Sequence, residues 1–439
     1  MQTQRLTRRG FSIASLLTGA GVWSGLAAAG PRDANETLNL GVIGAGGRGA
    51  DNLAGTAGQN IAAICDVDAQ PLDQTAARYP KARRYRDFRK LLDADDLDAV
   101  IIPSPDHTHA LAAIGAMRRG LHVYCEKPLA HNLAETELMM RVAGESKVAT
   151  QMGVQHHASD GYHRAVQILR AGVLGKVSEV HAWTVRPVWP QGIVRPRETP
   201  RDPRGLDWDL WLGPAPERPY HSAYHPRDWR GWFDFGTGAM GDFLPHLFDP
   251  VYEGLQLTAP AHITAESSKQ GGETFPKWSI VRFDFPARQI DDAKLPGVRV
   301  LWYDGGKQPP ADVAGVRRLP GNGALVVGER GKLFIPSHGK QPVVMAADKN
   351  ERLELPDPLP PNEQTHWQEW IAACESGKPT SADFAYGAAL TEVALLGNLA
   401  IRTGEPLAWD AANRRVANND KANALITRDY RKGWELPKS

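Results

Sequence analysis

The chain has 439 residues, of which 42% are hydrophobic, and its 51 basic residues nearly balance 50 acidic ones. This length suits two globular domains rather than one, and the balanced charge, without a basic block, argues against nucleic acid as a partner. Three widely spaced cysteines, Cys65, Cys125 and Cys374, form neither a disulfide framework nor a zinc motif, so we expect no metal site.

The N-terminus is typical of an export signal. Arg8 and Arg9 precede a weakly apolar run that ends in Ala27, Ala28 and Ala29, which is similar to a signal-peptidase site. We predict a Tat-type signal peptide over residues 1–29, a partnership with the Tat export machinery, and a periplasmic or otherwise exported mature protein. The Gly, Ser and Thr content of the run makes it a poor membrane anchor, and we expect no later run that could span a bilayer.

Short apolar runs alternate with amphipathic stretches from Leu38 onward. Asp68 can cap a helix whose first turn holds Pro71. The alternation predicts a parallel, doubly wound α/β sheet, a Rossmann domain over residues 38–157. The runs expected as its strands are 38–44, 60–65, 98–102, 121–124 and 148–151.

A second, α+β domain is predicted over residues 158–439. The segment 186–230 is rich in Pro, Trp, Arg and His, which predicts long ordered loops. We expect one larger sheet with helices on a face. Its strands are predicted at 176–185, 262–266, 279–285, 298–303, 324–328 and 332–335, and its helices at 160–171, 364–375 and 385–403.

A G-x-G-x-x-G motif follows the first predicted strand and opens a helical stretch. Its first glycine permits a tight turn, the second a close backbone approach to a pyrophosphate, and the third close packing of helix and strand. The motif therefore predicts a dinucleotide site. The residues predicted to bind the cofactor here are Gly44, Gly46, Gly47, Arg48 and Gly49.

Asp66 ends the second predicted strand, where a carboxylate accepts hydrogen bonds from an adenosine ribose and repels a 2′-phosphate. We therefore predict NAD rather than NADP, although Arg48 could pair with a phosphate. An exported enzyme meets no cytosolic cofactor pool, and the Tat route carries folded proteins. We expect the cofactor to stay tightly bound.

Two polar segments follow later strands of the same sheet. Pro105 and His109 come after the run 98–102, and Glu126 and Lys127 after the run 121–124. Ligands of such sheets bind outside the carboxyl ends of the strands, so we predict cofactor contacts from all four. Structural roles are the alternative: His109 can serve as a helix-start cap and Lys127 as an ion-pair partner of Glu126.

Asp242 and His246 are four residues apart, so on a helix they share one face. His246 could take a hydroxyl proton while Asp242 orients the substrate or the imidazole. The alternative is a helix-start aspartate beside a buried, hydrogen-bonded histidine.

Together, the glycine motif, the Glu126-Lys127-Pro128 turn and the Asp242-x-x-x-His246 helix resemble the Gfo/Idh/MocA family, which includes glucose–fructose oxidoreductase and inositol dehydrogenase. The resemblance implies a Rossmann domain followed by a larger α/β domain with an open, mostly antiparallel sheet. It also implies that Lys127, Asp242 and His246 are the catalytic set. It does not indicate the substrate, because members act on many sugars and polyols.

These patterns are compatible with three functions. The first is an exported oxidoreductase with tightly bound NAD(P), taking a hydride from a hydroxyl carbon of a sugar, polyol or glycoside. The second is a redox-neutral glycoside hydrolase that works through a 3-keto intermediate, because Gly46-Gly47-Arg48-Gly49 is similar to the loop of glycoside hydrolase family 109. The third is a non-catalytic sugar-binding protein, which should have lost one of the three catalytic residues, and none is missing.

The segment between Trp183 and Trp232 concentrates aromatic side chains, on which the C–H faces of sugars stack well. Packing in the core or at an interface of a homo-oligomer is the alternative. The residues predicted to contact the substrate are Trp189, Tyr224, His225 and Trp232.

Overall fold

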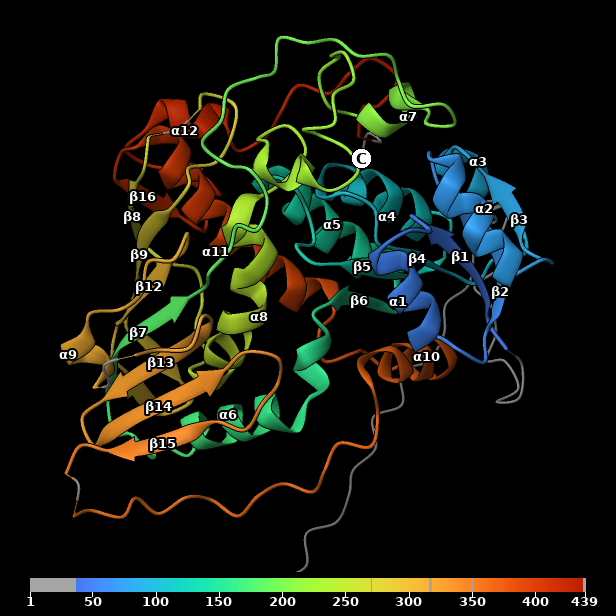
Figure 1. Ribbon diagram of the computed structural model, residues 1–439. Helices are drawn as coiled ribbons and strands as arrows, with labels where there is room; N and C mark the ends of the chain where they lie inside the picture. Colours follow the sequence, from blue (N-terminus) through green and yellow to red (C-terminus); the bar gives the residue numbers. More distant parts are fainter. Residues whose placement is uncertain (1–36, 270, 316–317, 349, 437–439) are drawn as a thin grey trace, which may run out of the picture.

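The computed structural model describes residues 37–436, apart from 270, 316–317 and 349. The predicted signal peptide over residues 1–29 lies outside the described residues. The described part forms two layered units side by side, with the Rossmann unit in blue and teal and a large sheet in green to orange (Figure 1).

The first sheet is parallel and has the strand order β3-β2-β1-β4-β5-β6, the order of dinucleotide-binding folds. Its central strands are apolar throughout because helices cover both faces, as in β4, where every residue is buried. The predicted fold class of this domain is confirmed. The strands are β1 Asn39–Ile43, β2 Asn60–Cys65, β3 Arg83–Tyr85, β4 Ala99–Ile102, β5 His122–Glu126 and β6 Thr150–Gly153.

Helices fill the connections between these strands. Asp68 caps the second helix as predicted, since its carboxylate accepts a hydrogen bond from the Gln70 amide at 3.0 Å. The edge strand β3 was not predicted, because its exposed arginines hide the apolar pattern of a strand. The helices are α1 Arg48–Gly55, α2 Ala69–Arg78, α3 Phe88–Leu91, α4 His109–Met117 and α5 Leu133–Ser146.

The second sheet is mixed and largely antiparallel, with the order β15-β14-β13-β7-β12-β9-β8-β16-β17. Its central pair, β7 and β12, is parallel, whereas the other paired neighbours run antiparallel. The strands are β7 Val177–Trp183, β8 His262–Ser267, β9 Ser279–Phe285, β12 Val298–Tyr303, β13 Gly323–Gly328, β14 Gly331–Pro336, β15 Val343–Ala346, β16 Leu407–Asp410 and β17 Arg415–Val416, with a separate hairpin of β10 Arg288–Ile290 and β11 Ala293–Leu295.

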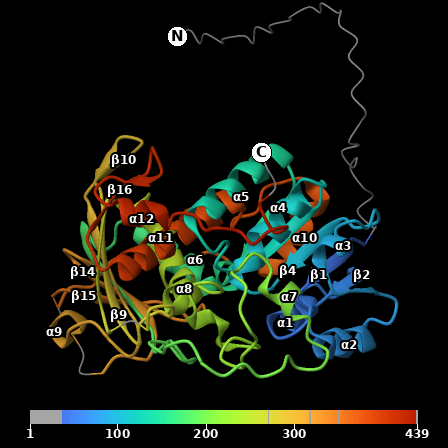
Figure 2. The same cartoon turned by 90° about the horizontal axis from the view of Figure 1, so that it is seen from above.

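Helices α6, α8 and α11 lie between this sheet and the first domain (Figure 2). Of these, α11 is the one described helix long and apolar enough to cross a membrane by length and composition, so the expectation of no such run is corrected. However, 83% of that window is buried, and α11 packs on α5, α8 and β8. Its apolarity reflects a place in the core. The remaining helices are α6 Asp160–Arg170, α7 Trp208–Leu212, α8 Gly238–Gly254, α9 Ala311–Ala314, α10 His366–Ser376, α11 Phe384–Thr403 and α12 Asp420–Ala424.

The C-terminal part of the chain returns to the first domain. Trp370 of α10 is fully buried in the core around β1, and Trp367 donates from its ring nitrogen to the Asn52 side-chain oxygen at 3.1 Å. Farther on, Arg428 donates to the buried Glu135 carboxylate of α5 at 2.7 Å. These contacts hold the two domains against each other and so fix the width of the space between them.

The tight packing of the glycine loop gives a test. A Cβ on Gly49 would stand 2.0 Å from the Gly44 carbonyl oxygen, so Gly49→Ala must push α1 away from β1. We expect a loss of stability of about 1–3 kcal/mol, the cost of overpacking, in urea unfolding followed by circular dichroism. Gly144→Ala in α5 is the matched control, because its Cβ meets open space, and it should be neutral or stabilising by up to about 1 kcal/mol. Equal stability of the two variants would contradict the packing argument.

Candidate active site

A groove of about 860 Å³ runs along the carboxyl ends of β1, β2 and β4. Gly44, Gly46 and Gly47 form one wall, Asp66 stands at one end, and Pro105 lines the floor. A side chain on Gly46 could not fit, because its Cβ would be 2.9 Å from Pro71. The loop therefore presents bare backbone to the groove at this position, which is what the close approach of a dinucleotide pyrophosphate requires.

Asp66 lies where the sequence places it, at the end of β2. Its carboxylate accepts hydrogen bonds from the amides of Ala45 at 2.9 Å, Gly46 at 3.3 Å and Asp68 at 2.9 Å. Burial raises the pKa of Asp66, and these backbone donors oppose that rise. The carboxylate is thus fixed beside the glycine loop, in the position expected for a ribose ligand.

Arg48 points away from this end of the groove. Its Nε donates to Glu126 at the end of β5 at 3.1 Å, and its Nη1 donates to Asp51 at 3.1 Å. Because β5 and β2 lie on opposite sides of β1, the guanidinium in this arrangement lies away from the place beside Asp66 that a 2′-phosphate would take. Glu126 also accepts from the Gln155 side chain at 2.8 Å.

The segment 186–230 covers the groove from the second domain. It is fastened to the first domain by backbone hydrogen bonds, from the Ala69 amide to the Gly205 carbonyl at 3.0 Å and from the Asp207 amide to the Val67 carbonyl at 2.9 Å. Arg86 adds a side-chain bond to the Gly205 carbonyl at 2.7 Å. In Figure 2 this green segment, which carries α7, runs from the second domain across to α1 and α2. A molecule in the groove therefore lies under a fastened cover.

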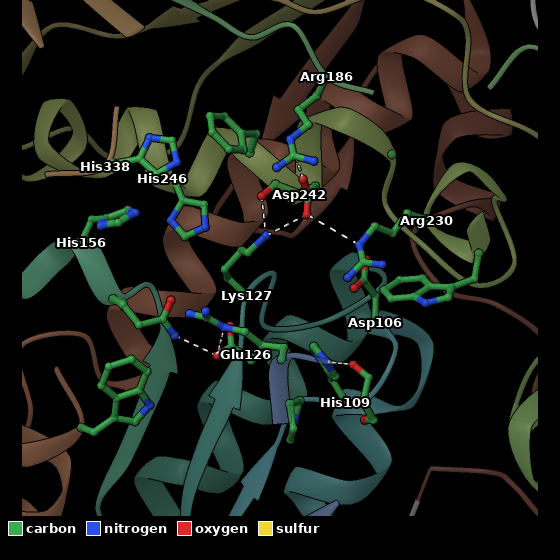
Figure 3. Close-up of a pocket in the computed structure, with 18 residues that line it drawn as sticks. Asp106, His109, Glu126, Lys127, His156, Arg186, Arg230, Asp242, His246 and His338 are labelled. Atoms are coloured by element: carbon green, nitrogen blue, oxygen red, sulfur yellow. Dashed lines mark hydrogen bonds and ion pairs between the residues drawn. The ribbon is translucent and has the colours of Figure 1, made fainter. Parts of the chain in front are cut away.

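A second cavity of about 490 Å³ lies at the domain junction (Figure 3). Both spaces share Arg48, Ser104 and Asp242 in their walls, so they adjoin each other. The predicted residues brought together in this cavity are Arg48, His109, Glu126, Lys127, Asp242 and His246.

Lys127 and Asp242 form an ion pair across the domain junction. The Lys127 Nζ donates to Asp242 Oδ1 at 3.0 Å and also to the Asp242 backbone carbonyl, and both side chains are 14% exposed. Arg186 and Arg230 approach the same carboxylate, with Nε atoms at 3.6 and 3.8 Å. Burial raises the pKa of Asp242, but the charges of Lys127, Arg230 and Arg186 outweigh burial and leave the pKa below its usual value. Asp242 is therefore ionised.

His246 lies one turn farther along α8, on the cavity side, as the spacing predicts. Burial, the charge of Lys127 and the neighbouring His156 hold its pKa well below the usual histidine value, so the imidazole is neutral. Its buried Nδ1 has no hydrogen-bond partner among the described residues. A neutral imidazole that lines a cavity can act as a proton acceptor.

Three histidines surround this corner of the cavity. The rings of His156 and His246 have centroids 5.4 Å apart, and those of His156 and His338 are 5.3 Å apart. The described residues contain no group of three or more His, Cys, Asp or Glu side chains placed to hold a metal ion. The cluster is therefore better understood as a polar wall of the cavity.

His109 serves a structural purpose. Its Nδ1 lies 2.9 Å from the Pro128 carbonyl and its Nε2 lies 2.7 Å from the Ser104 carbonyl. The ring thus joins the turn after β5 to the segment after β4 and borders the cavity without a free nitrogen. The ring therefore contacts the residue that follows Lys127, and both of its nitrogens face backbone carbonyls.

The four aromatic candidates divide into two pairs. Trp189 and His225 belong to the cover and line the groove. Tyr224 and Trp232 instead lie in a buried aromatic cluster, 2% and 0% exposed, and line neither cavity. Trp232 donates from its ring nitrogen to the Ala223 carbonyl at 2.8 Å, and Tyr224 packs edge-on against it. The expectation of a direct substrate contact is corrected for these two, because packing uses both faces of their rings.

Several residues that line the cavity were not predicted from the sequence. Arg186 and Arg230 belong to the predicted loop segment, where composition gave a signal but no position, and His338 comes from the β14–β15 connection without any motif. Asp106 is buried and accepts from the Thr237 hydroxyl at 2.6 Å. His156, which follows β6, was also not predicted as a site residue, because no motif in the sequence connects it with His246.

Known protein families account for both domains. An oxidoreductase-family model described as an NAD-binding Rossmann fold matches residues 38–154, and the model of that family's C-terminal alpha/beta domain matches residues 167–294. The chain belongs to the Gfo/Idh/MocA oxidoreductase family. The first domain is thus the family's NAD-binding domain, as the glycine motif predicted.

Curated relatives match about a third of the chain. Inositol 2-dehydrogenase of Salmonella typhimurium (strain LT2) is 30% identical over 151 residues, and that of Gluconacetobacter diazotrophicus is 33% identical over 152 residues. Each match covers 33% of this chain and 45% of the relative, so the chain spans less than half the length of these relatives.

Solved structures resemble the whole fold. A levoglucosan dehydrogenase with NADH and levoglucosan has a TM-score of 0.58 at 17% identity, covering 85% of this chain and 99% of the other. An aldose-aldose oxidoreductase from Caulobacter crescentus with glycerol has a TM-score of 0.58 at 16% identity, covering 85% and 100%. At these identities the likeness concerns the fold.

The place of Asp66 predicts cofactor choice. Asp66→Ala should weaken NAD binding by about 1.5–3 kcal/mol, the range for a hydrogen bond to a charged group, and should reduce discrimination against NADP. Titration calorimetry with both cofactors measures this. Asp66→Asn is the control that keeps an acceptor while removing the charge, so it should relax discrimination with a smaller loss of NAD affinity. A wild-type protein that prefers NADP would show that Asp66 has another role.

The neutral state of His246 predicts a pH profile. Because burial and Lys127 lower its pKa, the base stays unprotonated through the ordinary histidine range near about 6.5, and single-turnover cofactor reduction should fall only at more acidic pH. His246→Ala should slow that step by roughly a hundredfold or more and remove this acidic limb. The exposed His262 offers a control, since His262→Ala should leave the profile unchanged. A wild-type limb centred near about 6.5 would argue against this assignment.

Proposed function

We propose that the protein is an exported oxidoreductase with tightly bound NAD, which takes a hydride from a hydroxyl-bearing carbon of a sugar, polyol or glycoside. One observation carries this proposal. The neutral His246 and the Lys127–Asp242 ion pair line a single cavity that adjoins the dinucleotide groove. A proton acceptor, a fixed positive charge and a cofactor site thus meet in one place.

The groove residues fit the cofactor by their chemistry: Gly44, Gly46 and Gly47 offer open backbone, and Asp66 offers a carboxylate. Bound there, the nicotinamide supplies a hydride acceptor. His246 would accept the proton of the substrate hydroxyl, and the Lys127 ammonium would stabilise the negative charge that grows on that oxygen. Asp242 holds the ammonium in place through the 3.0 Å contact.

Retention of the cofactor is supported by the cover over the groove. Release requires the segment 186–230 to lift, which breaks the bonds of Gly205 to Ala69 and Arg86 and that of Asp207 to Val67. The twin-arginine sequence Arg8-Arg9 adds a reason for retention, because cofactor bound before export could not be replaced afterwards. We include export through the Tat route in the proposal on this ground.

A redox-neutral glycoside hydrolase is the second candidate. Arg48 of the Gly46-Gly47-Arg48-Gly49 loop lines the cavity that holds Lys127 and His246, and its partner Glu126 adds a carboxylate to the same cavity. A retained cofactor suits a cycle in which the hydride returns to the substrate. Non-catalytic sugar binding is disfavoured, because it offers no reason for Lys127, Asp242 and His246 to converge.

One preparation tests retention and net reaction together. Protein purified without added cofactor should release nearly stoichiometric NAD(H) on denaturation. A sugar substrate should then leave a stable NADH absorbance in the native protein until an oxidant restores it, whereas a hydrolase would show transient NADH and release an aglycone without any acceptor. Lys127→Ala is the control that should abolish either signal. Cofactor-free protein active only with added NAD would sink the retention proposal.

A further inference from the structure

Two arginines line the cavity that holds Lys127, Asp242 and His246, which we call the reaction cavity, and both have N–H groups without a hydrogen-bond partner in the described part of the chain. Arg186 follows β7 and Arg230 lies in a short 3-10 turn before α8, and Figure 3 shows both side chains directed at Asp242. A guanidinium carries five N–H donors. Among the described residues, the Arg186 side chain makes no hydrogen bond, and that of Arg230 makes one, to the Arg227 carbonyl at 3.3 Å.

The Asp242 carboxylate beside these arginines already has a close cationic partner. Lys127 already meets Asp242 at 3.0 Å with a hydrogen bond, while the Nε atoms of Arg186 and Arg230 stand at 3.6 and 3.8 Å, beyond good hydrogen-bond distance. Three cations thus surround one closely paired anion. Of the other carboxylates, Glu126 is paired with Arg48. Asp106 is buried and accepts from Thr237, and its pKa is raised by burial although the charges of Arg230 and Lys127 act against that rise.

Aromatic rings hold both guanidinium groups at the cavity. Arg230 lies over the Trp229 ring at 4.2 Å and over Trp189 at 5.8 Å. Arg186 lies over Phe243 at 5.3 Å and over Trp189 at 5.8 Å. Their side chains remain 31% and 32% exposed, so the charges are positioned and still open to a ligand.

We propose that the substrate carries a carboxylate, as in a sugar acid such as a uronate or aldonate, and that Arg186 and Arg230 bind it. Planar guanidinium groups match a carboxylate through paired N–H···O bonds. The carboxylate would lie between the two arginines, and the reacting hydroxyl would face Lys127 and His246. This inference rests on the proposed function, because it names the substrate class of the same cavity.

The affinities of acidic and neutral sugars test this inference without any measurement of turnover. Titration calorimetry of the NAD-loaded protein should be run with matched pairs: glucuronate against glucose, galacturonate against galactose, and gluconate against glucitol, with glucose 6-phosphate as a second anion. At least one acid should bind roughly 10- to 100-fold more tightly than its neutral partner, the size of one or two charge-assisted hydrogen bonds, and rising salt should reduce the difference. A panel in which no acid exceeds its neutral partner, or in which the phosphate binds best, would overturn the carboxylate assignment.

Arginine variants separate substrate recognition from stabilisation of the reacting oxygen. Arg186→Gln and Arg230→Gln should each weaken acid binding about tenfold or more and raise KM for the acid, with little change for its neutral partner. Arg201→Gln removes one positive charge from the exposed part of the same segment and should change neither. Equal loss of kcat on acidic and neutral substrates would instead assign the arginines to transition-state stabilisation and end the proposal. If acids bind selectively and no sugar reduces the cofactor, the proposed oxidoreductase function fails while this inference stands.

Discussion

The contact between Lys127 and Asp242 is the interaction on which the site depends. It joins the end of β5 in the first domain to α8 in the second, and both partners are largely buried. A buried ion loses hydration energy, and a partner within hydrogen-bond distance must offset that loss. The two domains are therefore required to meet at this pair, and the width and direction of the cavity follow from it.

The same pair sets the charge state of the neighbouring residues. The positive charge of Lys127 keeps Asp242 ionised despite burial and, one turn away, disfavours a second positive charge on His246. A base that is neutral and a lysine that is charged are the combination that removal of a hydroxyl proton requires. One contact thus provides both conditions, which explains why the two domains have to share the site.

The sequence predicted those strands well in which the pattern of apolar side chains matches the buried positions. Strands β2, β9 and β12 are runs of apolar or alternating residues, and their predicted ranges agree with the structure. Lys127 and His246 were predicted because each belongs to a short motif attached to a regular element. The edge strand β3 was missed, since an edge needs no apolar pattern.

The remainder of the site depends on long-range packing that local patterns do not encode. Arg186, Arg230 and His338 come from connections without periodicity, and their side chains meet only because the cover and the β14–β15 connection fold back over α8. Local patterns also do not distinguish the aromatic residues from one another. Trp189 and Trp232 look equivalent in the sequence, yet Trp189 lines the groove and Trp232 is fully buried.

The surplus of cations around Asp242 can be understood from the energetics of the cavity. Lys127 already pairs with Asp242, and burial raises the pKa of Asp106, the other acid near these cations. Arg186 and Arg230 therefore leave positive charge in the cavity that an arriving anion would offset. In an enzyme that acts on neutral sugars, that anion exists only as the oxygen of the reacting hydroxyl, and only during the reaction. An acidic substrate supplies it from the moment of binding, which offsets that positive charge in the ground state. The aromatic rings that lie against Arg186 and Arg230 then hold these two charges in place beside Lys127, so that the carboxylate of a substrate meets a fixed pair of guanidinium groups.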